Sequence, residues 1–341
     1  MTELFPIEHR DVVAVGASAG GVEALRALVG GLPAGYPGSL LVVLHLPRSA
    51  PSALPGILTR SGALPAATAR DGEPLLGGRI YVAPSDHHLL LLDGHLRLSR
   101  GPAENGHRPA VDPLLRSVAR AAGRRAVGVI LSGSRDDGAA GLAAIASSGG
   151  VTVVQDPEDA VYPWMPRAAL DLIKPDHVAP ADALGGLLAE ITAAELTAAP
   201  ASGRVHDPLL DAEVAMADLA PIGTETIASP AGYGCPDCGG SLFVIEDTPV
   251  PRFRCRIGHA WSPESLLDEQ AAALEGALWL ALRSLEEKAA LSRRMAAGRA
   301  GTSSSANFQA MAEDAETASV TIRKLIARLG STAEPEQSEV R

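Results

Sequence analysis

Short apolar runs, rich in β-branched residues, alternate with helical patterns from residue 11 to about residue 190. The runs predict strands at Val12–Val15, Leu40–Leu44, Arg79–Ala83, Val127–Leu131 and Val151–Gln155. Helical periodicity is found between them, at Gly21–Leu32, Pro113–Ala122 and Ala139–Ser147. Strands that are apolar on both faces and alternate with helices are typical of a parallel sheet covered on both sides. The pattern therefore predicts an α/β fold with a doubly wound, mostly parallel sheet.

An antiparallel hairpin is expected between the third and fourth of these strands. Residues 89–92 and 95–98 form two short apolar runs, and Asp93-Gly94 lies between them. Asp-Gly between two such runs is a strong hairpin signal, because glycine adopts positive φ without strain. The hairpin would interrupt the otherwise parallel arrangement.

The alternating pattern ends near residue 191, so a first domain is expected at residues 1–191. Residues 192–233 are rich in Ala, Pro, Ser and acidic residues, and their weak periodicity indicates a linker. Apolar residues with heptad spacing recur in two stretches of residues 263–330, which Gly298–Ser305 separates. These stretches predict either an α-helical hairpin or a dimerising coiled coil, and residues 331–341 are expected to form a disordered tail.

Composition narrows the kind of protein. Of the 341 residues, 46% are hydrophobic and 20% are charged, as in globular chains. The formal net charge of −11 argues against nucleic acid as the main partner, because phosphate binding needs clustered Lys and Arg. No apolar run reaches the roughly 18 residues that cross a bilayer, and the N-terminal residues lack the pattern of a secretory signal. These features predict a cytoplasmic protein without membrane insertion.

Ser18 stands in the turn after the first strand, within Gly16-Ala-Ser-Ala-Gly20. A serine held between glycines at the end of a strand has its hydroxyl lifted clear of the sheet, beside the free N–H groups of the next helix. That geometry suits a nucleophile with an anion-stabilising pocket. A phosphate or dinucleotide loop is the competing interpretation, because similar glycine-rich turns open Rossmann units. The turn alone does not choose between them.

Two other strand ends favour the nucleophile. His45 directly follows the second strand, and Asp136 and Asp137 follow the fourth. Because the carboxyl ends of parallel strands share one edge of a sheet, these side chains would meet Ser18 there. A nucleophilic serine needs a histidine to take its proton and a carboxylate to orient that histidine. Taken singly, the histidine could be structural and either aspartate could cap a helix. The acidic residue that a dinucleotide site needs about 20 residues after the turn is missing.

Several motifs, in order over residues 11–190, make the chain similar to the catalytic domain of chemotaxis protein-glutamate methylesterases, the CheB family. The motifs are Gly16-Ala-Ser-Ala-Gly-Gly21, His45-Leu-Pro47, Asp71-Gly72, Gly78-Arg-Ile-Tyr-Val-Ala-Pro84, His107-Arg-Pro-Ala-Val-Asp112, Gly128-Val-Ile-Leu-Ser-Gly133, Asp137-Gly-Ala-Ala-Gly141 and Met165-Pro166. The resemblance implies a hydrolase that acts on glutamate γ-methyl esters of chemoreceptor cytoplasmic helices, and often also deamidates receptor glutamines. It implies Ser18 as nucleophile, His45 as general base and Asp137 as orienting carboxylate. Asp136 stands where the family usually has Asn.

The chain departs from the family pattern in places. Ser132-Gly-Ser-Arg135 stands where Thr-Gly-Met-Gly is usual, and Trp164-Met-Pro166 stands where Gly-Met-Pro is usual. Arg135 and Trp164 are therefore expected to reshape the mouth of the cleft and to affect substrate choice. The family's N-terminal receiver domain is not expected, because the strand before Ser18 begins by residue 11. Control by aspartyl phosphorylation within the chain is not expected either.

All three cysteines lie in one short module, expected at residues 234–262. Cys235 and Cys238 form a C-x2-C motif, and Cys255 and His259 form a C-x3-H motif. Three thiolates and one imidazole suit tetrahedral Zn²⁺ and leave no position for water, so the set predicts a structural zinc ribbon and no catalytic metal. A redox pair and chance clustering are the alternatives.

The zinc module and the C-terminal helices together are typical of a docking or dimerisation unit. They leave a second hypothesis for the whole chain, in which a degenerate esterase serves as an interaction module in a signalling complex. The complete set of Ser18, His45 and Asp137 argues against such degeneracy.

Overall fold

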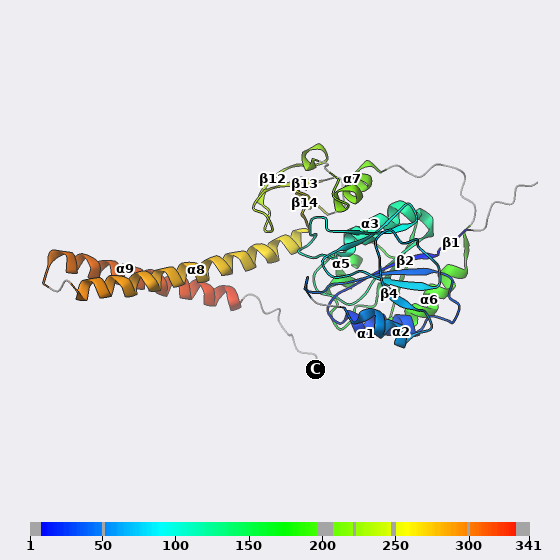
Figure 1. The fold of residues 1–341 in the computed structure, drawn as a ribbon, viewed down its shortest axis with the longest axis horizontal. Helices are drawn as coiled ribbons and strands as arrows, with labels where there is room; N and C mark the ends of the chain where they lie inside the picture. The colour runs from blue at the N-terminus through cyan, green and yellow to red at the C-terminus, as the bar shows by residue number, and fades with distance from the viewer. Residues whose placement is uncertain are drawn as a thin grey trace, which may run out of the picture. The chain divides into compact units, whose positions relative to one another are not determined.

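The computed structural model describes residues 8–49, 52–196, 207–220, 223–246, 250–298 and 301–331. The chain divides into two units, residues 1–266 and 267–341 (Figure 1). Among the described residues, no helix has the length and apolar character that crossing a lipid bilayer demands.

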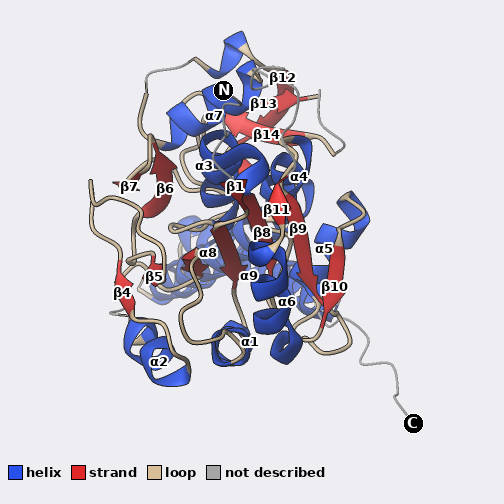
Figure 2. Cartoon of the chain, turned by 90° about the vertical axis from the view of Figure 1, so that its right-hand side faces the viewer, coloured by secondary structure: helices blue, strands red, loops and turns tan. Residues whose placement is uncertain are grey.

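A seven-stranded parallel sheet forms the centre of the first unit. Its strands follow the order β10-β9-β8-β2-β3-β5-β4. Figure 2 shows β10 and β9 toward one side of this sheet and β5 and β4 toward the other. Their bounds are β2 Val12–Ala17, β3 Ser39–Leu44, β4 Ala66–Thr68, β5 Arg79–Val82, β8 Ala126–Ile130, β9 Val151–Gln155 and β10 His177–Ala179. Every neighbouring pair is parallel. The doubly wound α/β fold expected from the sequence is confirmed.

Helices cover both faces of this sheet, which is why its central strands are apolar on both sides. Along β2, Val13 and Val15 belong to one apolar core and Val12 and Ala14 to the other. The first core is closed by α1 Gly21–Gly30, α2 Leu54–Ser61 and α6 Ala181–Ala193. The second is closed by α3 Val111–Ala122, α4 Ala139–Ser147 and α5 Trp164–Leu172. In Figure 1, α1 and α2 lie on the opposite side of the sheet from α3.

The expected antiparallel hairpin is present as β6 His88–Leu92 and β7 His95–Ser99. It forms a two-stranded sheet of its own and does not join the seven-stranded sheet. Leu89 and Leu91 are buried in the core that also contains α3, so the hairpin packs in the helical layer and leaves the parallel order intact. A further antiparallel pair joins β1 Glu8–His9 to β11 Glu195–Leu196.

A second, antiparallel sheet completes the first unit, and we call it the Cys/His module. Its strands, in spatial order, are β12 Ser229–Gly234, β13 Ser241–Ile245, β14 Arg252–Cys255 and β15 Ala260–Trp261. Its apolar core is small and consists of buried Cys235, Leu242, Cys255, Trp261 and Leu266.

The segment expected to be a linker contains a helix, α7 Pro208–Ala217, and a 3-10 turn at Thr224–Thr226. Asp207 caps α7 by accepting hydrogen bonds from the N–H groups of Leu209 and Leu210. An aspartate cap followed by proline at the first helical position is a favourable helix start. Residues 197–206 and 221–222 of that segment lie outside the described residues, and the expected domain boundaries stay predictions.

Two long helices follow, α8 Pro263–Ala297 and α9 Ser303–Ser331. The break between them falls in the expected Gly298–Ser305 segment. Ion pairs join Arg293 to Glu316 and Arg323 to Glu286, so the two helices lie antiparallel against each other. Except for residue 331, the expected tail lies outside the described residues.

Candidate active site

Ser18, His45 and Asp137 all follow the carboxyl ends of adjacent strands. The chain leaves β2 toward β3 on one side and later returns to β8 on the other, so the carboxyl end of β2 is the kind of topological switch point at which open α/β sheets bind their ligands. The N–H of His45 donates to the carbonyl of Ala17 at 3.1 Å, and the N–H of Ser18 donates to the carbonyl of Ser132 at 3.0 Å. Ser18 is therefore held between the loop after β3 and the loop after β8.

Glycines are required around Ser18 because the turn that carries it packs closely against the loop after β8. Gly20 has a φ of +69°, and a Cβ there would lie 2.7 Å from the hydroxyl of Ser132. A Cβ on Gly133 would lie 2.9 Å from the Cβ of Ser18 and 2.0 Å from the sulfur of Met165. Only glycine lets the loop after β8 pack this closely against the serine turn.

His45 contacts Asp137 directly, with 2.7 Å between Nε2 and Oδ2. The two side chains are 6% and 1% exposed. Because an ionised carboxylate only accepts hydrogen bonds, Nε2 of His45 carries the proton and Nδ1 carries the lone pair. Among the described residues, no group hydrogen-bonds to this buried Nδ1. The imidazole thus has a basic nitrogen available inside the site.

Asp137 is anchored by the start of α3. Its carboxylate accepts hydrogen bonds from the N–H of Val111 at 2.7 Å, the N–H of Asp112 at 3.2 Å and Nδ2 of Asn105 at 3.2 Å. Burial acts to raise the pKa of Asp137, but the hydrogen bond and charge of His45 outweigh it and hold that pKa below its usual range. The residue is an ionised, immobile partner for the imidazole.

Asp136 precedes Asp137 in the chain, but its side chain binds residues of the segment after β15 instead of His45. Its Oδ1 accepts hydrogen bonds from the hydroxyls of Ser262 and Ser265, both at 2.9 Å. Of the two neighbouring aspartates, Asp137 is the one that contacts His45.

Asp112 was part of a motif in the sequence, but its contacts could not be read there. Its Oδ1 accepts the N–H groups of Gly138 at 3.1 Å and Gly141 at 2.6 Å, which caps α4. Burial and the charge of Asp137 raise the pKa of Asp112. Asp112 thereby fixes the helix that begins directly after Asp137.

His107 belongs to a motif that the sequence shows, but no role could be assigned from the sequence to it or to Asn105 in the same loop. The ring of His107 stacks on that of His45, with centroids 3.7 Å apart. Burial and the nearby His45 lower the pKa of His107 to about 4. Both histidines line a depression of about 350 Å³, together with Leu46, Pro47, Arg48, Gly106 and Arg108. The depression borders the imidazole of His45, and Ser18 is not among its lining residues.

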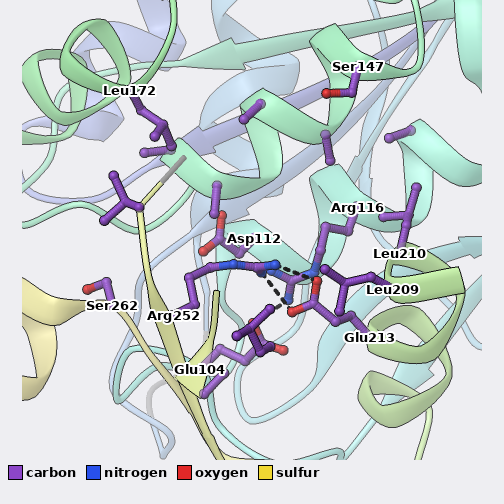
Figure 3. Close-up of a pocket in the computed structure, with 18 of the residues that line it drawn as sticks. Glu104, Asp112, Arg116, Ser147, Leu172, Leu209, Leu210, Glu213, Arg252 and Ser262 are labelled. Atoms are coloured by element: carbon purple, nitrogen blue, oxygen red, sulfur yellow. Dashed lines mark hydrogen bonds and ion pairs between the residues drawn. The ribbon is translucent and has the colours of Figure 1, made fainter. Parts of the chain in front are cut away.

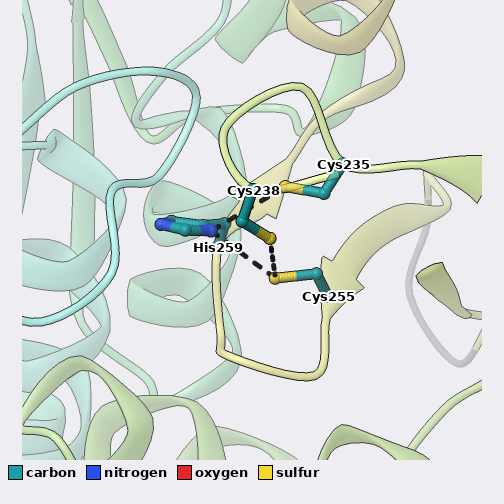
Figure 4. Close-up of side chains that lie close together, drawn as sticks. All are labelled: Cys235, Cys238, Cys255 and His259. Carbon is teal, nitrogen blue, oxygen red and sulfur yellow. Dashed lines mark hydrogen bonds between the residues drawn. The ribbon is translucent and has the colours of Figure 1, made fainter. Parts of the chain in front are cut away.

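The side chains of Cys235, Cys238, Cys255 and His259 lie close together, as the sequence predicts, and could hold a metal ion (Figure 4). We call these four residues the Cys/His cluster. Sγ of Cys238 lies 3.7 Å from Sγ of Cys255, too far for a disulfide bond of about 2.05 Å. Nδ1 of His259 lies 3.8 Å from Sγ of Cys235 and 3.6 Å from Sγ of Cys255. Tetrahedral Zn²⁺ would set S–S separations of about 3.8 Å and S–N separations of about 3.6 Å. The donor set and its spacing fit a four-coordinate ion.

A larger cavity of about 870 Å³ lies between the Cys/His module, α7 and the helices α3 and α4 (Figure 3). Ion pairs lie in the wall of this cavity. The guanidinium of Arg252 donates to the two carboxylate oxygens of Glu213 at 2.7 and 2.8 Å, and Arg116 binds Glu104. Ser18, His45 and Asp137 are not among its lining residues. The cavity therefore does not open on the three candidate catalytic residues, although Asn105 and Asp112, which bind Asp137, are part of its lining.

Comparison with known proteins places the same half of the chain in one group. The family model described as CheB methylesterase matches residues 13–188. A protein-glutamate methylesterase/protein-glutamine glutaminase of Anaeromyxobacter dehalogenans is 42% identical over 182 residues, which are 53% of this chain and 53% of that protein. One from Rhodospirillum rubrum is 41% identical over 171 residues, 48% of this chain and 44% of that protein.

A solved structure agrees with these relatives. The crystal structure of the Thermotoga maritima CheB methylesterase catalytic domain has a TM-score of 0.51 and 32% identity to this chain. The match covers 53% of this chain and 97% of that structure. The chain spans about half the length of the curated relatives that it matches.

Proposed function

The chain belongs to the CheB methylesterase family, and we propose that it is a serine carboxylesterase that hydrolyses glutamate γ-methyl esters. Ser18 is the nucleophile, His45 the general base and Asp137 the orienting carboxylate. The observation that carries this proposal is the buried bond between His45 and Asp137, at the sheet edge where the loops after β3 and β8 hold the Ser18 turn.

The geometry supports a two-step acyl transfer. Nδ1 of His45 takes the Ser18 proton while the serine oxygen attacks the ester carbonyl. The resulting imidazolium, held by Asp137, then gives the proton to the departing methoxide, so that methanol leaves and a glutamyl ester on Ser18 remains. Water, deprotonated by the same nitrogen, hydrolyses this ester and restores the serine.

Backbone N–H groups stabilise the oxyanion in this mechanism. Among the described residues, no acceptor is bound by the N–H of Ala19 or the N–H of Ser134, which flank Ser18 on two loops. Each such donor is worth about 3–4 kcal/mol to the transition state. Since these donors belong to the backbone, the side chains of the Ser132–Arg135 turn leave this role intact.

The substrates are the methylated cytoplasmic helices of chemoreceptors, and the site also deamidates receptor glutamines with release of ammonia. The names of the relatives support both activities. This assignment makes the protein cytoplasmic. Trp164, which is 49% exposed at the start of α5, and Arg135 adjust which helix is accepted.

Methanol release from methylated receptor fragments tests the proposal. The unmodified protein should release methanol, and Ser18→Ala and His45→Ala should abolish release. Robust turnover by Ser18→Ala protein contradicts the assignment. A fluorophosphonate probe separates the enzyme from a degenerate esterase that only binds partners, because the degenerate protein would leave Ser18 unlabelled.

We further propose that the Cys/His cluster binds one structural Zn²⁺. Four protein ligands fill its coordination shell, so the ion organises the module and takes no part in the ester chemistry. A module with so small an apolar core gains its stability from the metal. Elemental measurement on the purified protein should find about one zinc per chain, and a metal-free, fully folded protein contradicts this proposal.

We propose, last, that the helical hairpin pairs with a second copy of the chain. Large apolar side chains stay exposed on both helices, among them Leu267, Leu274, Leu280, Leu291 and Val320. Light scattering at several concentrations should give the mass of a dimer, and substitution of Leu280 and Leu291 by Gln should give a monomer.

A further inference from the structure

The loop Ala103–His107 lies between the Cys/His module and the candidate triad, and we propose that the module positions Asp137 through Asn105. Metal occupancy of the module then controls the reactivity of Ser18, although the metal never touches the substrate. This inference rests on the proposed function.

The module holds this loop by its backbone. The N–H of Ala260 donates to the carbonyl of Ala103 at 3.2 Å, and the N–H of Asn105 donates to the carbonyl of Ala260 at 2.8 Å. Ala260 directly follows the cluster residue His259 and starts β15. The loop is thus bonded to the strand that the cluster pins in place.

The side chain of Asn105 joins the module to the triad. Its Oδ1 accepts the N–H of Ser262 at 2.8 Å, and its Nδ2 donates to Asp137 at 3.2 Å and to Asp112 at 3.4 Å. A backbone N–H only donates, so Ser262 fixes which end of the amide faces the module. The NH₂ group must then face the two carboxylates. Without Ser262, the amide loses the contact that prevents its oxygen from turning toward Asp137.

The backbone of the loop also favours a single arrangement. Asn105 is 4% exposed and has a φ of +51°, in the left-handed region that few residues other than glycine and asparagine adopt. The same short loop carries His107, whose ring stacks on His45. Two members of the triad therefore touch this loop.

A buried ion pair ties the loop to the module a second time. Arg254 lies next to Cys255 on β14, and its guanidinium binds Oε1 of Glu104 at 3.0 Å. These side chains are 1% and 2% exposed. Glu104 also pairs with Arg116 of α3, and Arg254 also pairs with Glu213 of α7. Opening the pair would leave each of these two buried charges with one partner fewer, which favours a fixed position of the loop against β14.

Metal release acts at the turn between β14 and β15, which carries Cys255 and His259. Loss of the ion frees this turn, and with it the N–H of Ser262. The amide of Asn105 then loses its orientation, and Asp137 loses one of its donors. A less firmly held carboxylate leaves the imidazole of His45 less well oriented.

The test compares four samples: the unmodified protein and the Asn105→Gly variant, each with and without the metal. Glycine removes the amide and keeps the left-handed backbone accessible. The readout is the rate at which a fluorophosphonate probe labels Ser18. In the unmodified protein, removal of zinc by a chelator should slow labelling about tenfold, and added Zn²⁺ should restore it. In Asn105→Gly, labelling should be slow already, and metal removal should change it less than twofold.

Arg256→Ala is the matched control. Arg256 lies in the same turn of the module, is exposed and pairs with Glu225, away from the loop. Ser18 in the Arg256→Ala protein should be labelled at the same rate as in the unmodified protein, and removal of zinc should slow that labelling by the same factor. Equal slowing by metal removal in the unmodified protein and in Asn105→Gly overturns the coupling, as does full labelling of metal-free protein.

Zinc release gives a second readout that needs no activity. Coupling is reciprocal, so Asn105→Gly should release Zn²⁺ to a chromophoric chelator several times faster than Arg256→Ala does. Identical release rates contradict the inference, even where metal-free protein unfolds. Absence of Ser18 labelling in every metal-loaded protein, with release rates that differ, refutes the proposed esterase and leaves the coupling standing.

Discussion

The imidazole of His107 stacks on that of His45, with ring centroids 3.7 Å apart and ring planes inclined by 11°. A protonated His107 would place a positive charge against the ring that accepts a proton in the proposed mechanism. Burial, first, and then His45 lower its pKa from 6.5 to about 4, while Asp137 acts in the opposite direction and Arg135 adds to the lowering. The neutral stacked ring supports His45 without competing for its proton.

The lowered pKa of His107 makes stability depend on pH. Above about pH 6.5 the residue is neutral in both the folded and the unfolded chain, and its contribution is fully present. As the pH falls toward 4, the unfolded chain takes up a proton that the folded chain refuses, and stability is lost. Urea unfolding between pH 7 and pH 4 should show this loss to be smaller in His107→Phe by up to about 3 kcal/mol. Parallel pH profiles of the two proteins contradict the prediction.

The two neighbouring aspartates should differ sharply in function. Asp137→Asn removes the charge that fixes the tautomer of His45, and Ser18 labelling should fall by about 10³–10⁴-fold. Asp136→Asn keeps an oxygen that accepts the hydroxyls of Ser262 and Ser265, so labelling should fall less than threefold. The rate of Ser18 labelling should be measured on variants whose melting temperatures equal that of the unmodified protein. Equal losses of labelling rate in the two variants would refute the assignment of Asp137 as the orienting carboxylate.

Gly133 should tolerate no side chain. A Cβ there would lie 2.0 Å from the sulfur of Met165 and would press against Ser18, so Gly133→Ala should cost about 1–3 kcal/mol and slow labelling more than tenfold. Gly186→Ala is the control, because nothing lies within 4 Å of a Cβ in that exposed position of α6. There, alanine should raise stability by about 0.5–1 kcal/mol. Chemical unfolding and the probe rate report both effects.

Two arginines, Arg254 of β14 and Arg256 of the turn that follows it, should contribute very differently to stability. Arg254 is buried between Glu104 and Glu213, and Arg254→Ala should cost about 3–5 kcal/mol because it leaves two buried carboxylates with fewer partners. Arg256 has 78% of its side chain exposed, and Arg256→Ala should cost less than about 1 kcal/mol. Unfolding of the metal-loaded proteins in urea measures the difference, and similar midpoints would argue against a stabilising role of the buried cluster.

Some elements gave little signal in the sequence. β4 and β10 have three residues each and are only partly buried, so they show no continuous apolar run. Pro and Gly interrupt the periodicity of α2 and α6, as Gly185-Gly186 does in α6. These helices depend on packing against the sheet more than on local propensity.

The sequence by itself determined the central strands, their parallel arrangement and the strand ends at which Ser18, His45 and Asp137 would lie. It could do so because burial on both faces demands continuous apolar runs, and because parallel strands deliver their carboxyl ends to one edge. It likewise determined the four residues of the Cys/His cluster, since short spacings limit how far the ligands can separate. The tertiary structure alone decided that Asp136 binds Ser262 and Ser265, that His107 stacks on His45, and that Ser262 reaches Asn105 across 157 positions of the chain. Such contacts depend on how separate elements pack, and no local pattern of residues specifies them.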